Sequence, residues 1–453
     1  EYEVLGPVMT PVLKSERAEI GGRLVSETSH TNTLSLARAP QDKARWVYTC
    51  QPTEQQSATY EYNTGVKLSD VTTERMFDAF GNATRVTVRS GKRKIRTNSL
   101  YYNDTVNWVL GRVYISRVER SGDGQSANIV SSFSYDKKTG LLTCERYAPG
   151  NPYGYEKTYG YDAYGNVTCD IVTASGADAP RQTTTEYDAR GRFKTASVNA
   201  LGHRTIYEVD GKTGMVTSQT DALGLTTTYT YDSFGNLLKE TDPVGETAHT
   251  TGWSKGQAHA PQGTVWYERV ERTGEAPVTS FMDCIGRTVR TVTTSGDGSA
   301  DLFTDTEYDN CGRVRSVSNP YFQKYGPVFN SSEYDGAGRP VSHCNTDGQT
   351  TRYAYDGLRT TTTDPCGGTH VRIVDSDGRL VESVDALGAS VRYTYDLNDN
   401  CTAVEGPTTT IRTKYDGGGR KTRTVDPDLG EVTYAHNGFG ELTGQTDSKG
   451  TAT

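Results

Sequence analysis

A short motif, Tyr-Asp-x-x-Gly followed by Asn or Arg, returns along most of this chain and constrains its fold more than any other feature. It stands at YDAYGN (161–166), YDSFGN (231–236), YDNCGR (308–313) and YDGGGR (415–420), and some copies begin with Val or His in place of Tyr. Apart from one gap, successive copies lie 19 to 26 residues apart. A period of about 21 residues is typical of repeat proteins, in which each unit packs mainly against its neighbours.

Each repeat carries a second turn signal, Asp-x-x-Gly without the tyrosine, as in DALG at 221–224 and 385–388. The Asp side chain bonds the backbone of its own turn, and Gly supplies a positive φ. Between the turns the residues alternate, so that Thr227, Tyr229 and Tyr231 share one face of a strand. The pattern predicts an all-β fold, a continuous ribbon of antiparallel β-hairpins to which each repeat adds two strands.

The strand residues indicate what kind of sheet this is. Apolar residues make up only 34% of the 453 residues, although that set includes 29 tyrosines. Neither face is rich in Val, Ile, Leu or Phe, so we do not expect a sandwich with an aliphatic core. Tyrosine can pack across strands, at about 0.2–1 kcal/mol per pair, and keep its hydroxyl in water. We predict a largely single-layer sheet that curls to protect its edges, as a solid solenoid, an open superhelix or a hollow vessel.

The repeats divide the chain into two regions of one continuous β structure. Residues 1–130 are less regular and lead into the array, which fills residues 131–453. An insertion is predicted at about 233–307, where residues such as Trp253 and Trp266 do not repeat. Its simpler interpretation is a loop or plug that packs over the sheet, and the sharper one is a contact for cargo or a partner chain. With no initiator Met and an end inside a repeat, the sequence is expected to be a fragment of a longer protein.

Charge and cysteine spacing argue against several classes of partner. The net charge of −8 and the pI near 5.5 argue against nucleic-acid binding. The basic cluster GKRKIR at 91–96 is expected to be a solvated loop or hairpin tip, not a polyanion site. No apolar run is long enough for a membrane span. The eight cysteines lack metal-ligand spacing and are expected to be mostly free thiols.

Motifs for catalysis and cofactor binding are incomplete in this sequence. GKTG at 211–214 lacks the earlier glycine of a phosphate-binding loop, because Ile206 stands at that position. Acidic pairs such as Asp375 and Asp377 lack the remaining ligands of a calcium loop and are interpreted as turns. We therefore predict that the protein is not an enzyme and has no catalytic residue, cofactor or metal site.

The segment TTTYTYDSFGNLLKETDPVG at 226–245, with its recurring Tyr-Asp-x-x-Gly, resembles the YD-repeat or RHS-repeat family. That family includes bacterial RHS proteins, the B and C components of insecticidal toxin complexes and animal teneurins. The likeness covers about residues 135–453, and the strands at 60–120 resemble those preceding the repeats in toxin-complex B components and SpvB-type relatives. The resemblance assigns a structural repeat motif to Tyr161, Asp162, Gly165, Tyr187, Asp188, Gly191, Asp221, Gly224, Tyr231, Asp232, Gly235, Tyr308, Asp309, Gly312, Tyr334, Asp335, Gly338, Tyr355, Asp356, Asp385, Gly388, Tyr395, Asp396, Tyr415, Asp416 and Gly419.

The resemblance implies that the ribbon spirals into a curved, hollow shell. In bacterial relatives such a shell encloses a toxic polypeptide, so we expect a secreted or cell-surface shell segment whose partners are toxin cargo and other toxin-complex components. Self-cleavage in the family uses D-P-x-G-L, but DPVGE at 242–246 and DPCGG at 364–368 lack the Leu and are interpreted as turns. The alternative function is a cell-surface adhesion or carbohydrate-binding protein with glycan partners.

Overall fold

The fold is built from strands and turns throughout the part of the chain that the structure describes. The computed structural model describes residues 1–5, 11–38, 47–176 and 179–450, and no helix occurs among them. The strands before the regular repeats are β1 (Tyr2–Val4), β2 (Pro11–Leu13), β3 (Ser15–Ile20), β4 (Arg23–Arg38), β5 (Val47–Tyr60), β6 (Lys67–Phe77), β7 (Ala83–Ser90), β8 (Arg93–Asp104), β9 (Val109–Gly122), β10 (Gln125–Tyr135) and β11 (Leu142–Tyr147).

The strands that follow are shorter and of more even length. They are β12 (Tyr155–Tyr161), β13 (Val167–Ala174), β14 (Arg181–Tyr187), β15 (Lys194–Val198), β16 (Arg204–Val209), β17 (Val216–Thr220), β18 (Thr226–Tyr231), β19 (Leu237–Thr241), β20 (Glu246–Trp253), β21 (Trp266–Arg272), β22 (Val278–Met282), β23 (Thr288–Thr294), β24 (Asp301–Tyr308), β25 (Val314–Ser318), β26 (Tyr321–Phe322), β27 (Phe329–Tyr334), β28 (Pro340–Cys344), β29 (Thr350–Asp356), β30 (Arg359–Thr363), β31 (Thr369–Val374), β32 (Leu380–Val384), β33 (Ser390–Tyr395), β34 (Cys401–Glu405), β35 (Thr410–Tyr415), β36 (Lys421–Asp426), β37 (Gly430–His436) and β38 (Leu442–Thr446).

Pairing follows the order of the sequence except around β26, where β24 pairs with both β25 and β26 and β25 pairs with β27, and every pairing whose register is described is antiparallel. The β17–β18 hairpin turns at the Asp221 motif, the β18–β19 hairpin turns at the Tyr231–Asp232 motif, and the alternation then continues. At the tyrosine-type hairpins the register shifts by one residue just before the tyrosine, as between Thr230 and Tyr231. The shift is a β-bulge, because Tyr231 pairs with Leu237 but Thr230 pairs with Lys239, which leaves Leu238 as the extra residue on β19. The all-β ribbon of antiparallel hairpins predicted from the sequence is confirmed.

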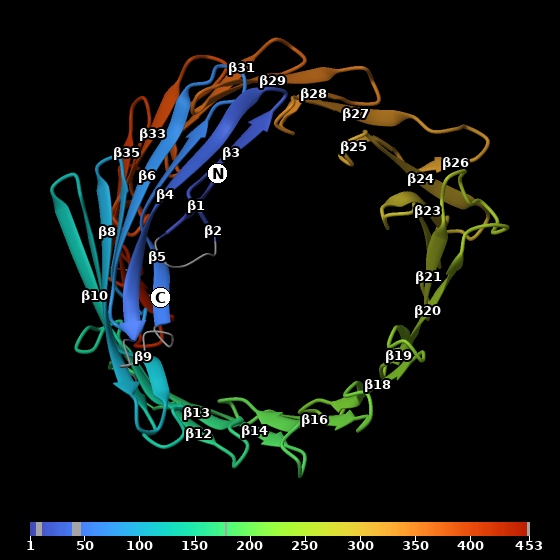
Figure 1. Cartoon of the computed structure of the whole chain (residues 1–453). Coiled ribbons are helices and arrows are strands. Elements are labelled where there is room, and N and C mark those ends of the chain that lie inside the picture. Colours follow the sequence, from blue (N-terminus) through green and yellow to red (C-terminus); the bar gives the residue numbers. More distant parts are fainter. Residues whose placement is uncertain (6–10, 39–46, 177–178, 451–453) are drawn as a thin grey trace. The chain divides into compact units, whose positions relative to one another are not determined.

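The described chain falls into two compact units. The first comprises Glu1–Gly160, Asp170–Arg181 and Ala354–Thr453, and the second comprises Tyr161–Cys169 and Gln182–Tyr353. Within the first unit, the long N-terminal strands, blue in Figure 1, lie side by side with repeats from the other end of the chain, drawn in orange and red. Segments about 300 residues apart therefore meet in this unit.

The segment predicted as an insertion at 233–307 consists mainly of strands β19–β23, and these strands pair in order like the rest of the ribbon. The repeat period lengthens here because residues 254–265 form a longer connection between β20 and β21. In this connection Ala260 packs against a small cluster formed by Phe281, Val292 and Phe303. Only this connection, and not the whole predicted insertion, lies outside the strand pattern.

The apolar interior is small, as the composition predicts. Among the described residues, the fully buried apolar side chains are Ala58, Cys144, Ala148, Ala174, Ala196, Phe281, Met282, Val292, Phe303, Val371 and Ala403. Several of these are alanines, which bury little area, so aliphatic burial is a minor source of stability. The turns and the contacts between neighbouring strands therefore supply most of the interactions that hold the ribbon together.

Candidate functional site

The Tyr-Asp-x-x-Gly turns are the most regular polar structure of the protein, and Asp232 shows how each one is built. Its Oδ1 accepts hydrogen bonds from the backbone N–H groups of Phe234 and Asn236 at 2.8 and 2.9 Å, and its Oδ2 accepts one from the Asn236 side chain at 2.8 Å. Gly235 closes the turn at φ +90°, a conformation that favours glycine. The amide of Asn236, followed by the backbone donors, lowers the pKa of Asp232.

In other repeats an arginine replaces the asparagine and extends the network to the next turn. The Arg313 Nε donates to Asp309 Oδ2 at 2.6 Å, and its Nη1 donates to the carbonyl oxygen of Asp335 at 3.0 Å. Its guanidinium also lies 4.7 Å from the ring centroid of Tyr334, in cation–π contact. Arg287 and Arg379 lie over Tyr308 and Tyr395 in the same way. Consecutive turns are thus linked along one edge of the ribbon.

Four of the motif tyrosines donate hydrogen bonds to backbone carbonyl groups, which corrects for these four the expectation that the hydroxyls stay in water. The hydroxyl of Tyr231 donates to the carbonyl oxygen of Val216 at 2.9 Å, and that of Tyr395 donates to Leu380 at 2.7 Å. Tyr308 and Tyr334 make the equivalent bonds. The acceptor lies at the start of the neighbouring strand, so each ring fastens two strands beside a turn.

The structure places the predicted motif residues in this pattern, with one exception. Positive φ values between 65° and 90° occur at Gly165, Gly191, Gly224, Gly235, Gly312, Gly338, Gly388 and Gly419. The aspartates whose carboxylates accept hydrogen bonds from backbone N–H groups of their own turn are Asp162, Asp188, Asp221, Asp232, Asp309, Asp335, Asp385, Asp396 and Asp416. The tyrosines Tyr161, Tyr187, Tyr231, Tyr308, Tyr334, Tyr395 and Tyr415 each end a strand. Tyr355 and Asp356 differ, because they lie within β29 and a tighter turn follows at Gly357 (φ 59°).

Turn tips near the C-terminus contact N-terminal strands, and we call these contacts the seam. The Arg93 guanidinium donates to both carboxylate oxygens of Asp399 at 2.9 Å, to Asp377 at 3.3 Å and to the carbonyl oxygen of Leu397 at 3.0 Å. The side chain of Arg93 is only 18% exposed. Its hydrogen bonds are the main cause of a lowered pKa at Asp399. Arg93 lies at a hairpin tip, as expected, but it is not a solvated charge.

Two further turns complete the seam. The ring of Tyr153 lies against the backbone of Gly417 and Gly418, and a Cβ on either glycine would collide with it. In the next turn, a Cβ on Gly438 would collide with the backbone oxygen of Ser175. Arg181 covers the ring of Phe439 at 3.8 Å and pairs with Glu441 at 2.6 Å.

The sequence gives only a partial signal for the seam. Gly418 in YDGGGR indicates close approach, because other copies of the motif have larger residues at that position, whereas Gly417 and Gly438 give no such signal, since YDGAGR at 334–339 has a glycine at the same position. Arg93 carried no such signal, since its partners are defined only by the fold.

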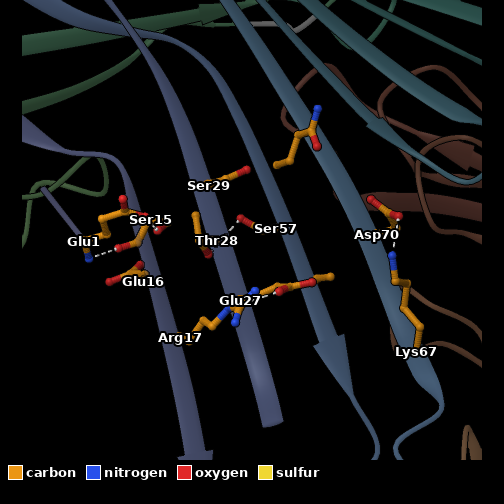
Figure 2. Close-up of a pocket in the computed structure, with 12 residues that line it drawn as sticks. Glu1, Ser15, Glu16, Arg17, Glu27, Thr28, Ser29, Ser57, Lys67 and Asp70 are labelled. Atoms are coloured by element: carbon orange, nitrogen blue, oxygen red, sulfur yellow. Dashed lines mark hydrogen bonds and ion pairs between the residues drawn. The ribbon is translucent and has the colours of Figure 1, made fainter. Parts of the chain in front are cut away.

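A cleft of about 570 Å³ lies on strands β3–β6 (Figure 2). Its charged groups pair with one another, as in Arg17–Glu27 at 3.5 Å and Lys67–Asp70 at 2.9 Å, and the N-terminal amine donates to the carbonyl oxygen of Ser15 at 2.7 Å. The hydroxyls of Thr28 and Ser57 also bond each other at 3.2 Å. These groups satisfy each other and form no nucleophile–base pair, so we assign this cleft no chemistry.

The described residues contain no group of three or more His, Cys, Asp or Glu placed to hold a metal ion. All eight cysteines are free thiols. Within the same ranges no helix is long and apolar enough to cross a membrane.

This geometry defines a class, the β-hairpin repeat proteins whose turns are linked along a ribbon edge. Residues 212–247, 334–369 and 374–411 match the family model described as RHS Repeat, so these segments of the chain are RHS repeats. No curated protein matches the chain in sequence.

Solved structures share the fold. The crystal structure of TcdB2-TccC3 without hypervariable C-terminal region matches with a TM-score of 0.74 and 12% identity, over 95% of this chain and 33% of that one. The crystal structure of TcdB2-TccC3 matches with a TM-score of 0.72 and 13% identity, over 95% and 31% of the two chains. The protein thus spans about a third of the length of those chains, and at such identities the likeness shows the fold.

Proposed function

We propose that this chain is a non-enzymatic wall segment of a toxin-complex shell, and that the complete shell encloses a toxin polypeptide for delivery. The observation that carries the proposal is the fold shared with TcdB2-TccC3 over 95% of the chain at a TM-score of 0.74. The expected partners are the cargo polypeptide and the other components of the toxin complex. The protein that contains this chain would be secreted with them.

The chemistry of the turns supports a structural role. The repeated charged residues, such as Asp309 and Arg313, are engaged with their own turn or the next one. A catalytic group needs an orientation toward substrate and a partner that tunes its pKa, and the turn carboxylates are instead saturated by backbone donors. The polar groups that the sequence repeats most often therefore serve to hold the ribbon together.

The small apolar interior supports enclosure. A compact domain buries its sheet face against another layer, whereas this ribbon is stabilised mainly by neighbouring strands and linked turns. A sheet that does not need a packed core on its face can line a space that holds another chain.

Protease protection of the cargo tests this proposal. The full-length protein is purified with its cargo polypeptide and treated with trypsin, either in native buffer or after heating above the unfolding transition. We expect the cargo to survive in native buffer and to be digested after heating, because a closed wall excludes the protease. Free cargo, digested in native buffer, is the matched control. Digestion of assembled and free cargo at the same rate would overturn the proposal.

A further inference from the structure

The basic cluster at 91–96 contributes to a second feature, which is separate from the seam. Arg93 points into the seam, but Lys94 and Arg96 lie further along β8 and line a cleft of about 390 Å³ together with Arg120, Ser121, Ser126 and Asn128. The volume lies in the range of small-molecule sites.

Strand register brings these residues together. Lys94 pairs with Ser121, which pairs with Ser126 on β10, so an ammonium and two hydroxyl groups form one row. Arg96 pairs with Glu119, which pairs with Asn128, and this gives a second row. Partners directly opposite in antiparallel strands share a face, with Cβ atoms about 4.5–5.5 Å apart. The rows therefore place cationic and neutral hydrogen-bond donors on the same part of the sheet.

The charge of this cleft differs from that of the chain. Two cationic side chains, Lys94 and Arg96, share this face with one carboxylate, that of Glu119, whereas the side chain of Arg120 alternates to the other face of β9. The face therefore carries a net charge of about +1 in a protein of net charge −8. The cleft in Figure 2 has the opposite balance, since its four carboxylates, those of Glu1, Glu16, Glu27 and Asp70, outnumber its three cations, which are Arg17, Lys67 and the N-terminal amine. A concave surface with excess positive charge concentrates anions.

One guanidinium group of this face has a donor to spare. Arg96 Nε is buried and has no hydrogen-bond partner among the described residues. The nearest carboxylate oxygen to Arg96 is that of Glu119, 3.8 Å from Nη1, which is beyond hydrogen-bond length. Buried donors without partners are costly, so an acceptor that reaches them would bind favourably.

We propose that this cleft binds a small ligand carrying a tetrahedral oxyanion, a phosphate or sulfate ester. Arginine forms forked hydrogen bonds to such oxygens, lysine adds a point charge, and Ser121 and Ser126 add neutral donors. The volume suits one or two such groups, and Ala127 is the only apolar residue in the lining, so the cleft offers little to the side chains of an acidic peptide. The binding is independent of the proposed enclosure of a polypeptide.

Titration calorimetry on the full-length protein at low ionic strength tests the site with three probes, namely tripolyphosphate, a sulfated disaccharide and a glutamate oligomer. Binding of tripolyphosphate or of the disaccharide supports the site, and the tighter of the two identifies the source of the oxyanion. Absence of binding by both at millimolar concentration, or binding of the glutamate oligomer alone, would overturn it.

Three variants locate the binding. We expect Lys94→Gln with Arg96→Gln to weaken it by about tenfold to a hundredfold, because two charged hydrogen bonds are lost. Glu119→Gln should strengthen binding several-fold, since it removes the only carboxylate, and this variant keeps the test decisive if the double variant fails to fold. Lys212→Gln, at an exposed turn of the second unit, is the matched control and should change nothing. Equal affinity in the double variant and the wild type would contradict the assignment.

Discussion

Two turns with the same backbone show that one set of residues stabilises the turn and another set determines what the turn contacts. In the second unit, the turn of Asp232 carries Phe234 at its tip, 90% exposed. In the first unit, the turn of Asp416 carries Gly417 and Gly418 at the same positions, and the ring of Tyr153 lies on them. The aspartate, the positive-φ glycine and the hydrogen bonds are the same in both. The skeleton of the turn is therefore fixed by the motif, whereas the two residues at the tip decide what the turn can contact.

The largest expected effect comes from the glycine that completes the skeleton. Gly235→Val should destabilise the protein by about 1–3 kcal/mol or more, because a β-branched residue resists φ +90° and its Cβ would overlap the Met215 methyl group. Gly388→Val, at φ +85° in open space, has only the conformational cost and should be slightly milder, because the Met215 methyl group ends a flexible side chain and can move. Thermal unfolding of both variants measures the difference. Unchanged melting in both would show that the turns tolerate any residue at this position.

The residue that follows the turn aspartate or asparagine should affect stability only where another segment of the chain packs on the turn. Gly438→Leu should cost about 1–3 kcal/mol, because the new side chain collides with the Ser175 backbone while the φ of Gly438 is not positive. The matched control is Ser233→Leu, the same position in the exposed Phe234 turn, which should melt like the wild type. A comparable loss of stability in both variants would mean that the turn backbone itself, and not the contact in the seam, disfavours a large residue at this position.

Removing the Arg93 side chain should open one contact of the seam. We expect Arg93→Ala to cost about 1–2 kcal/mol, less than a fully buried pair, because the Asp399 side chain is 50% exposed and solvent screens it. Lys92→Ala removes an adjacent but exposed pair with Asp123 and serves as the control. Faster hydrogen exchange of the Leu397 segment in Arg93→Ala, but not in Lys92→Ala, is the expected signature.

The local rules of the ribbon could be predicted from sequence, whereas its long-range contacts could not. Alternation around Tyr231 and the Asp-x-x-Gly spacing depend on neighbouring residues only, so the hairpins and their strand order followed from them. The seam joins Arg93 to Asp399, which lie 306 residues apart in the sequence, and no local pattern around either residue identifies the other as its partner. The same limit explains why Lys94 and Arg96 were expected to lie in a solvated tip, since Ser121 and Ser126 are placed beside them only by the register of β8–β10.

The smallest effect concerns the charge of the turn aspartate, and the protein contains its own reference. Asn437 holds the equivalent turn with a neutral oxygen that accepts from Phe439 and Glu441 at 3.0 Å. Asp232→Asn should therefore keep the turn and destabilise it slightly at neutral pH. The pKa of Asp232 is lowered in the folded state, so its contribution is present above the unfolded value of about 3.8 and is lost as the pH falls through the folded value. The melting temperatures of the wild type and Asp232→Asn should differ at pH 7 and converge below about pH 3.8. A constant difference across this range would show that the asparagine fails for geometric reasons and that charge has no part in the turn.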